Sequence, residues 1–235
     1  RQRQMCIRDR FTFICLISEK RECIINYESA CSRGGNMYVK EEKPVNKIVE
    51  ILRKTSSHLF KFHGEVAMHL FLNDDFILPS KVDICVERKK LLEIIRVIPE
   101  EFTIHYYDEQ LNERLRESLS LSDVEHVKIF KNDTEVMTIF VYDVVNDEWL
   151  FRLDHHIRLP KNNIYFHSLS WNVDYIKPEI VLMYDLMSEQ KYHQFSNYKA
   201  VIDSLSYYQF YILKLVVGEQ RIKKAIVNSS AKKIS

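Results

Sequence analysis

The segment FHGEVAMHLFLNDDFILPSKVDICV, Phe62–Val86, constrains the fold of this chain more than any other part of its sequence. Gly64 interrupts a helical pattern, and a second short amphipathic helix is expected directly after it. A polar loop follows, and Val82–Val86 then predicts a buried strand with a single acid, Asp83. Because side chains alternate along a strand, Lys81 and Asp83 are expected on the same face of a sheet. The segment therefore indicates a domain that mixes helices with a buried sheet.

The segments on either side continue this mixture of helices and strands. Apolar residues at three- and four-residue steps predict one helix before the segment, and a shorter pattern ended by Pro99 predicts another after it. An apolar run then predicts a strand, and a charged stretch is expected to form a helix or an ordered loop. In chain order these four segments are 44–59, 91–98, 102–107 and 108–122.

A hairpin is predicted next, because Val124–Phe130 and Val136–Val145 are strand-like and flank the turn sequence Lys131-Asn132-Asp133. Trp149–Leu153 is expected to pair onto the same sheet. Beyond Pro160 the pattern becomes helical.

The last third of the chain predicts helices. Pro178 stands at a favourable first-turn position of an amphipathic helix. Two more helices are expected over 194–205 and 206–217, with Ser206 as N-cap of the second. Tyr207, Tyr208 and Tyr211 fall at helical spacing and are expected to pack inside the protein, and the tail from Arg221 is expected to be a frayed helix or a solvated end. The predicted fold class is α/β (α+β): a mixed sheet flanked by helices over residues 37–163, then a helical region over 164–235 packed on it.

The first 36 residues differ in character from the rest. RQRQMCIRDR resembles a translated sequencing-adapter fragment, and Arg33-Gly34-Gly35 back-translates to a purine-rich ribosome-binding site just before Met37. We therefore expect residues 1–36 to be a non-native or untranslated leader. The alternative is a signal peptide, because Phe11–Ile17 is apolar and follows basic residues, although this run is short and no small-x-small cleavage site follows it.

Composition narrows the class of protein. With 46% hydrophobic and 29% charged residues the chain can form a packed core. Lys+Arg number 34 and Asp+Glu 33, and this balance argues against a nucleic-acid-binding protein. After the leader only Cys85 remains, which indicates a reducing compartment without disulfides, so we expect a cytoplasmic protein. No later stretch approaches the roughly 18 apolar residues of a membrane span.

Two more motifs follow the Gly64 turn and the Asp83 strand. They are Trp149-Leu150-Phe151-Arg152, with Ile157 and Pro160 after it, and Ile176-Lys177-Pro178-Glu179-Ile180-Val181-Leu182. In this order the elements resemble the nucleotidyltransferase fold of the polymerase-beta type. More narrowly, they resemble the aminoglycoside and lincosamide nucleotidyltransferase-like proteins of bacteria, over roughly Ile48–Val217.

This resemblance implies a reaction and a set of site residues. Such enzymes transfer a nucleoside monophosphate from a nucleoside triphosphate to a hydroxyl group of a small molecule, and Mg²⁺ held by carboxylates offsets the charge that develops. The resemblance implies that Gly64, Ser80 and Lys81 contact the nucleotide. It also implies that Asp83 holds the metal and acts in catalysis together with Asp143. The sequence does not indicate an oligomeric state.

The chain also departs from the family pattern. The family carries Asp-x-Asp on this strand, and Lys81 stands in place of the first acid. His63 and Glu65 replace the small neighbours of the turn glycine, and the family's later Lys-Asp pair falls at His193-Gln194. An ammonium group cannot ligate magnesium and would itself neutralise Asp83, so a thousandfold or larger loss of rate is expected. The alternative function is a non-catalytic module that binds a ligand or another protein.

Other polar groups have weaker functional signals. Histidines near the turn could share a metal ion or serve an enzyme of another class, but satisfied or exposed side chains are favoured. Asp154-His155-His156 is expected to be structural, Asn73-Asp74-Asp75 to be a polar loop, and Cys85 to be an inert core thiol. The histidines concerned are His58, His63 and His69.

Overall fold

The computed structural model describes residues 43–108, 110, 112–114, 120–188 and 197–231. The chain divides into two units, Arg1–Lys40 and Glu41–Ser235, and all of these residues belong to the second. The predicted leader, residues 1–36, and the expected start at Met37 lie outside the described residues, as do His193 and Gln194.

Helices and strands are mixed along the chain up to residue 187, and the described residues beyond it form helices. The helices are α1 (Pro44–Ser56), α2 (Gly64–Asn73), α3 (Leu91–Arg96), α4 (Pro178–Met187), α5 (Tyr198–Ser204), α6 (Tyr207–Val217) and α7 (Glu219–Ala231). The strands are β1 (Phe60–Phe62), β2 (Val82–Glu87), β3 (Thr103–Tyr107), β4 (Glu113–Arg114), β5 (His126–Lys131), β6 (Thr134–Tyr142), β7 (Val144–Val145), β8 (Glu148–Leu150), β9 (Arg158–Pro160), β10 (Tyr165–Ser168) and β11 (Val173–Ile176).

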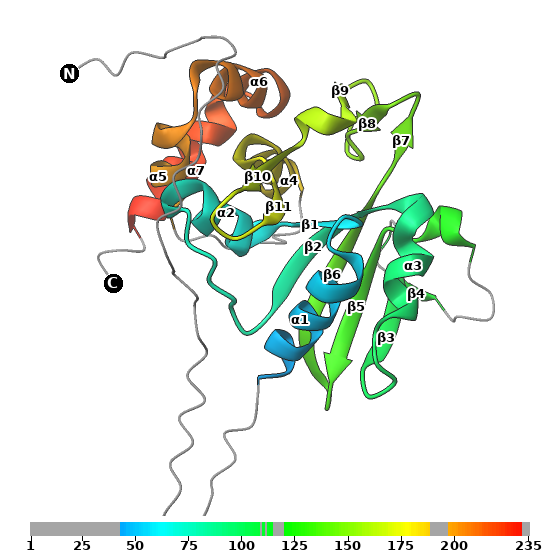
Figure 1. Cartoon of the computed structure of the whole chain (residues 1–235). Coiled ribbons are helices and arrows are strands. Elements are labelled where there is room, and N and C mark those ends of the chain that lie inside the picture. The colour runs from blue at the N-terminus through cyan, green and yellow to red at the C-terminus, as the bar shows by residue number, and fades with distance from the viewer. Residues whose placement is uncertain (1–42, 109, 111, 115–119, 189–196, 232–235) are drawn as a thin grey trace, which may run out of the picture. The chain divides into compact units, whose positions relative to one another are not determined.

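The main sheet is mixed and has the strand order β10-β11-β1-β2-β6-β5-β3-β4 (Figure 1). Two neighbouring pairs are parallel, β1 with β11 and β2 with β6, and the other pairs are antiparallel. A second, three-stranded sheet has the order β7-β8-β9. Parallel neighbours need long crossover connections, so strands distant in sequence meet at the centre of the main sheet.

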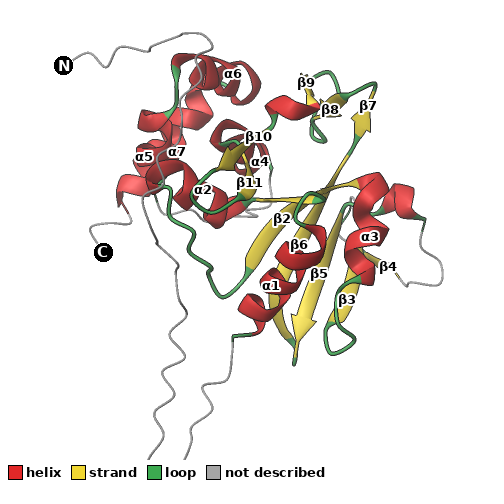
Figure 2. Cartoon of the chain, in the orientation of Figure 1, coloured by secondary structure: helices red, strands yellow, loops and turns green. Residues whose placement is uncertain are grey.

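The helices form two groups beside this sheet. In Figure 2, α1 and α3 lie side by side against one face of its central strands, and α2 groups with α4, α5 and α7. Side-chain alternation along β2 gives the sheet two different faces. Val82, Ile84 and Val86 are fully buried in the apolar core, and the residues between them point to the opposite face. Asp83 and Cys85 lie on that opposite face.

The predicted fold class is confirmed: a mixed sheet with flanking helices is followed by C-terminal helices. The predicted hairpin forms from β5 and β6, and both Asn132 and Asp133 adopt positive φ angles of 49° and 61°. Short polar side chains tolerate this conformation, which suits a two-residue hairpin turn. Ser206 also caps α6 as predicted, because its hydroxyl accepts a hydrogen bond from the backbone N–H of Gln209.

The end of the second hairpin strand was predicted wrongly. The expected strand over 136–145 ends at Tyr142, and Trp149–Leu153 does not join the main sheet. Instead β7 and β8 pair with each other across a turn in which Asn146 and Asp147 have φ angles of 52° and 62°. This second hairpin was not separated in the sequence because β7 is only two residues long and continues the apolar pattern of β6.

Several short strands were also missed. β1 has three residues, and β10 and β11 have four each, in a region where the sequence was interpreted as helical. The main sheet thus extends on both sides of residue 163, and the domain boundary there stays a prediction. The described part of the segment 108–122 contains β4 and a short 3₁₀ helix, and no α-helix.

The C-terminal helices pack through α4 and α6. Glu179, at the start of α4, is buried and accepts a hydrogen bond of 2.6 Å from the side-chain amide of Gln209 on α6. Burial raises the pKa of Glu179, although the Gln209 hydrogen bond opposes this shift. The tail forms a helix, α7, from Glu219 to Ala231. Across the described ranges, no helix combines the length and the apolar character that crossing a bilayer requires.

Candidate functional site

The Gly64 turn and the Asp83 strand meet as the sequence predicts. The backbone N–H of His63 donates a hydrogen bond of 2.8 Å to the carbonyl oxygen of Asp83. Gly64 follows with φ of 57°, a left-handed conformation that favours glycine, and begins α2. Since β1 runs antiparallel to β2, with Phe62 opposite Ile84, the N-terminus of α2 lies beside the beginning of β2. The geometry brings a helix N-terminus close to a strand-borne acid.

The ammonium group of Lys81 lies between two carboxylates. Its Nζ is 2.8 Å from Oε1 of Glu135 and 3.6 Å from Oδ1 of Asp83. Asp83 is buried, and the side chains of Lys81 and Glu135 are 37% and 23% exposed. Lys128 approaches Glu135 from the other side, with Nζ 3.5 Å from Oε2. A positive charge therefore already occupies the space in which two acids converge.

These contacts fix the charge states. Burial opposes the ammonium form of Lys81, but the charge of Asp83 and the hydrogen bond with Glu135 outweigh it and raise the pKa of Lys81. Burial likewise works against ionised Glu135, yet hydrogen bonds from Lys81 and from the Thr138 hydroxyl lower the pKa of Glu135. Both partners are therefore charged at neutral pH, and the ammonium stays in place.

Glu135 was missed by the sequence interpretation. It lies at the beginning of β6, which pairs in parallel with β2 so that Asp83 is opposite Thr138. Only this pairing brings Glu135 next to Lys81, and strand order cannot be read from the hydrophobic pattern of either strand. The only local indication of this contact was that Glu135 stands just beyond the predicted hairpin turn Lys131-Asn132-Asp133.

The structure does not bring Asp143 to Asp83. Asp143 follows the last residue of β6, five positions beyond Thr138, which corresponds to roughly 16 Å along the strand. Its two carboxylate oxygens accept hydrogen bonds of 2.7 Å and 2.9 Å from the guanidinium group of Arg88. Asp143 thus lies in an ion pair at the far end of the sheet from Lys81.

The remaining predicted residues lie on the surface or in local contacts. Ser80 is exposed in the loop before β2, and Glu65 is 3.6 Å from His69 on the outside of α2. His58, His155 and His156 are exposed. Within the described ranges, no group of three or more His, Cys, Asp or Glu side chains is arranged to hold a metal ion. In the loop after α2, Asp74 accepts hydrogen bonds from the hydroxyls of Ser168 and Ser170 and so joins α2 to the β10–β11 turn.

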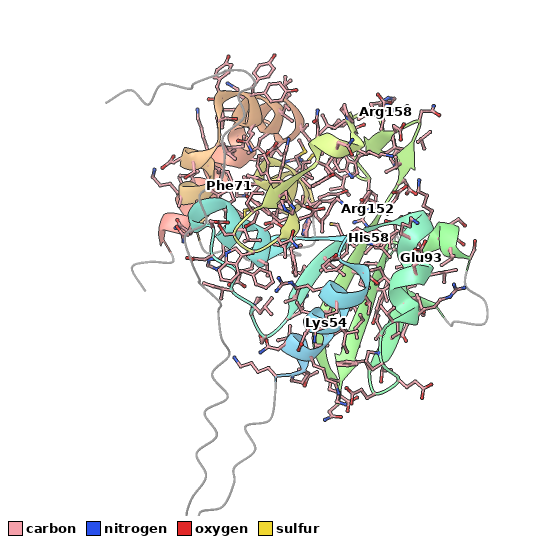
Figure 3. All side chains as sticks on the ribbon, in the orientation of Figure 1. Lys54, His58, Phe71, Glu93, Arg152 and Arg158 are labelled. Atoms are coloured by element: carbon pink, nitrogen blue, oxygen red, sulfur yellow. The ribbon has the colours of Figure 1, made fainter. Side chains whose placement is uncertain are left out.

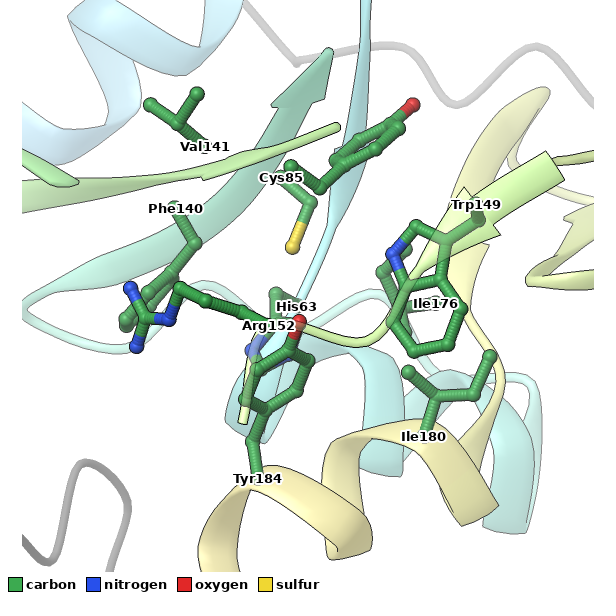
Figure 4. A pocket seen from close by; sticks show the side chains of 10 residues that line it. His63, Cys85, Phe140, Val141, Trp149, Arg152, Ile176, Ile180 and Tyr184 are labelled. Carbon is green, nitrogen blue, oxygen red and sulfur yellow. The ribbon is translucent and has the colours of Figure 1, made fainter. Parts of the chain in front are cut away.

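A small cavity lies deeper on the same face of the sheet (Figure 4). It has about 20 Å³ of space for the centre of a water molecule, and its walls are mainly aromatic and aliphatic. Cys85, two residues beyond Asp83, points into it, and burial followed by the charge of Asp83 raises the pKa of this thiol. The lining residues are His63, Cys85, Phe140, Val141, Tyr142, Trp149, Arg152, Ile176, Ile180 and Tyr184.

Arg152 connects this cavity to the neighbouring strands. It follows β8 and is labelled in Figure 3. Its Nη1 donates a hydrogen bond of 2.6 Å to Glu125, which stands directly before β5. The other carboxylate oxygen of Glu125 is 3.8 Å from Arg88. The arginine of the Trp149–Arg152 motif therefore belongs to a network with Glu125 and Arg88, which joins the segment after β8 to the strands of the main sheet.

His126 makes the stability of the folded protein depend on pH. Its ring is 2% exposed and stacks on Tyr107 with the two planes 2° from parallel. Burial, reinforced by the charges of Lys128 and Arg152, lowers the pKa of His126 to about 4. In the unfolded chain a histidine takes up its proton near pH 6.5. Between these two values the unfolded state binds more protons, so stability falls as the pH falls.

We expect the free energy of unfolding to drop by about 2 kcal/mol through His126 between pH 6.5 and 5. His126→Phe should remove this part of the slope, because a phenyl ring can stack on Tyr107 without titrating. Urea denaturation of both proteins at pH 7 and pH 5 measures the difference. If the free energy of unfolding changed with pH equally in parent and variant, His126 would not be the neutral, buried group that this prediction requires.

Comparison with known proteins gives weak likenesses. No protein-family model and no curated protein matches the chain. Among solved structures, the Megavirus polyadenylate synthase is similar with a TM-score of 0.35 and 11% identity, covering 79% of this chain and 36% of the viral one. A "putative nucleotidyltransferase" from H. pylori is similar with a TM-score of 0.37 and 13% identity, covering 81% of this chain and 96% of the other. At these values neither likeness assigns the chain to a family, and the narrower resemblance to antibiotic-modifying enzymes stays a prediction.

Proposed function

We propose that this chain is a nucleotidyltransferase-like protein that binds a phosphate-bearing small molecule, such as a nucleoside triphosphate, without magnesium and without efficient transfer. The sequence motifs and the meeting of the Gly64 turn with Asp83 support the family. The observation that carries the proposal is the ammonium of Lys81, 2.8 Å from Glu135 and 3.6 Å from Asp83.

The residues at this site do not fit the metal ion that the family resemblance implies. Mg²⁺ requires near-octahedral oxygen ligands, including carboxylates, at about 2.0–2.1 Å. Asp83 and Glu135 supply two carboxylates, but both are in contact with an ammonium that a metal ion would have to displace. Asp143, the third expected acid, is held by Arg88. The protein's own cation therefore takes the role of neutralising the acids.

This arrangement favours binding over catalysis. Neutralised carboxylates no longer repel the phosphates of a ligand, so an anion can approach the N-terminus of α2 beside Asp83. A fixed ammonium does not polarise a leaving pyrophosphate as a metal ion does, because an ammonium cannot coordinate several phosphate oxygens at once. In this proposal the chain keeps the contact between the Gly64 turn and the Asp83 strand, and it loses the metal ion that would drive the chemical step.

Titration calorimetry with ATP tests the proposal. We expect ATP to bind in excess EDTA at least as tightly as in millimolar Mg²⁺, because Lys81 supplies the compensating charge and Mg²⁺ in solution only lowers the negative charge of the ligand. Pyrophosphate release in the presence of candidate hydroxyl acceptors should stay at background. Binding that appears only with Mg²⁺, or rapid pyrophosphate release, would contradict the proposal, and an absence of binding to any nucleoside triphosphate would exclude a nucleotide as the ligand.

A further inference from the structure

Helix α6 is apolar on two opposite sides. Gln209, Leu213 and Val217 recur every four residues and are buried against α4 and the core. On the other side, Tyr207, Tyr211 and Leu215 recur with the same spacing. Helices of globular proteins that are apolar all round are normally buried all round. The second side of α6 therefore has the composition of an interior surface.

This second side is nevertheless exposed. Tyr207, Tyr208, Tyr211 and Leu215 are 84%, 68%, 48% and 66% exposed, so the expectation that these tyrosines pack inside the protein is wrong. The rings of Tyr207 and Tyr211 stack on each other with centroids 6.3 Å apart. Lys214, which flanks the stripe, is paired with Glu219 at 2.8 Å. We refer to the four exposed residues as the α6 stripe.

We propose that the α6 stripe is a self-association surface on which a second copy of this chain docks about a two-fold axis at Tyr211. Tyr207 and Leu215 lie four residues before and four residues after Tyr211. When two such helices cross in antiparallel orientation, Tyr211 meets its own copy and Tyr207 of each chain meets Leu215 of the other. An isologous interface requires such a self-complementary surface, and the four-residue spacing of Tyr207, Tyr211 and Leu215 provides it.

The area of the stripe suits a weak dimer. A buried aromatic side chain contributes about 150–250 Å². With the exposed fractions of its four residues, the α6 stripe offers roughly 500 Å² per copy, and a symmetric pair would bury roughly 1,000 Å². That value lies at the lower limit for specific interfaces, so a dissociation constant on the order of 10–100 µM is expected. Tyrosine is also enriched in the cores of such interfaces.

The charges around the stripe favour association as well. Since Lys214 already has its partner, docking does not strip water from an unpaired charge next to the interface. Antiparallel α6 helices also place the N-terminal end of each dipole beside the C-terminal end of the other. The stripe therefore loses little polar hydration when two copies meet.

Sedimentation velocity of the full chain tests the proposal over about 1–300 µM, which brackets the expected constant. The parent protein should change from monomer to dimer across this range. Tyr211→Glu and Tyr211→Lys should each weaken association at least tenfold, because like charges then face each other at the two-fold axis. Mixing the two variants in equal amounts should restore a dimer, since position 211 of one chain meets position 211 of the other.

Leu169→Glu is the matched control. Leu169 is 89% exposed at the β10–β11 turn, so the same kind of change is made outside the α6 stripe and should leave association unchanged. Unchanged urea midpoints for all variants would exclude unfolding as the cause. A parent protein that stays monomeric to 300 µM (about tenfold above the central estimate), a Tyr211→Glu variant that still dimerises, or a mixture that fails to associate would overturn the proposal.

Discussion

Lys81→Asp is expected to raise the affinity of this protein for Mn²⁺ or Mg²⁺ by about 100-fold or more. The substitution removes the ammonium that now contacts Asp83 and Glu135 and adds a carboxylate on the same side of β2. One unit charge at 4 Å is worth about 4 kcal/mol near a protein surface, and partial exposure reduces this gain to about 3 kcal/mol. Three convergent carboxylates are the ligand type that hard divalent cations prefer.

Calorimetric titration with Mn²⁺ measures the affinity, and thermal unfolding gives a second readout. In EDTA the Lys81→Asp protein should be less stable than the parent, because three carboxylates then repel one another, and saturating Mn²⁺ should reverse this loss. Lys81→Met is the control, since it removes the ammonium without adding an oxygen ligand and should give a much smaller gain in affinity. If Mn²⁺ did not change the stability of the Lys81→Asp protein, the side chains at positions 81, 83 and 135 would not converge as described.

Arg88→Met is expected to lower the free energy of unfolding by about 3 kcal/mol. The guanidinium donates two hydrogen bonds to Asp143, one of 2.8 Å to the carbonyl of Leu121 and one to the carbonyl of Val124. Its side chain is 18% exposed, so water can replace few of these bonds. The variant would leave two carbonyl groups without their donor and the carboxylate of Asp143 without the guanidinium that binds it, whereas Glu125 keeps its ion pair with Arg152.

Urea denaturation at pH 7 measures this loss, with Arg158→Met as the matched control. Arg158 forms one ion pair of 3.8 Å with Glu148, and both side chains are about half exposed. Such a pair contributes less than about 1 kcal/mol, so the control should unfold close to the parent. Arg88→Lys should give an intermediate result, because an ammonium keeps the charge but cannot reach all four acceptors. Equal losses for Arg88→Met and Arg158→Met would contradict the role of Arg88.

The sequence predicted the local part of the candidate site. Period-two alternation was enough to put Lys81 and Asp83 on one face, and the glycine at position 64 was enough to place a turn. The partners of these residues depend on tertiary structure. Glu135 reaches Lys81 because β6 lies beside β2, and Asp143 is unable to reach Asp83 because the parallel register of those strands separates them. Neither fact is encoded within a single strand.

The fold was predictable where elements are long and strongly patterned. α1, α2, α4 and the β5–β6 hairpin follow from apolar periodicity and turn residues. The strands that were missed are two to four residues long, and such segments are too short for a period to be recognised. They form because neighbouring strands offer them hydrogen-bond partners, as β1 finds between β2 and β11.

The position of β1 has a consequence for biosynthesis. Phe62 pairs with Tyr175, so one side of this central strand has no neighbour until β11 has left the ribosome. Until then β1 presents an open edge, which is a template for wrong intermolecular pairing. Emergence of β11, rather than the collapse of the first half of the nascent chain, thus determines when this edge is no longer exposed to intermolecular pairing during translation.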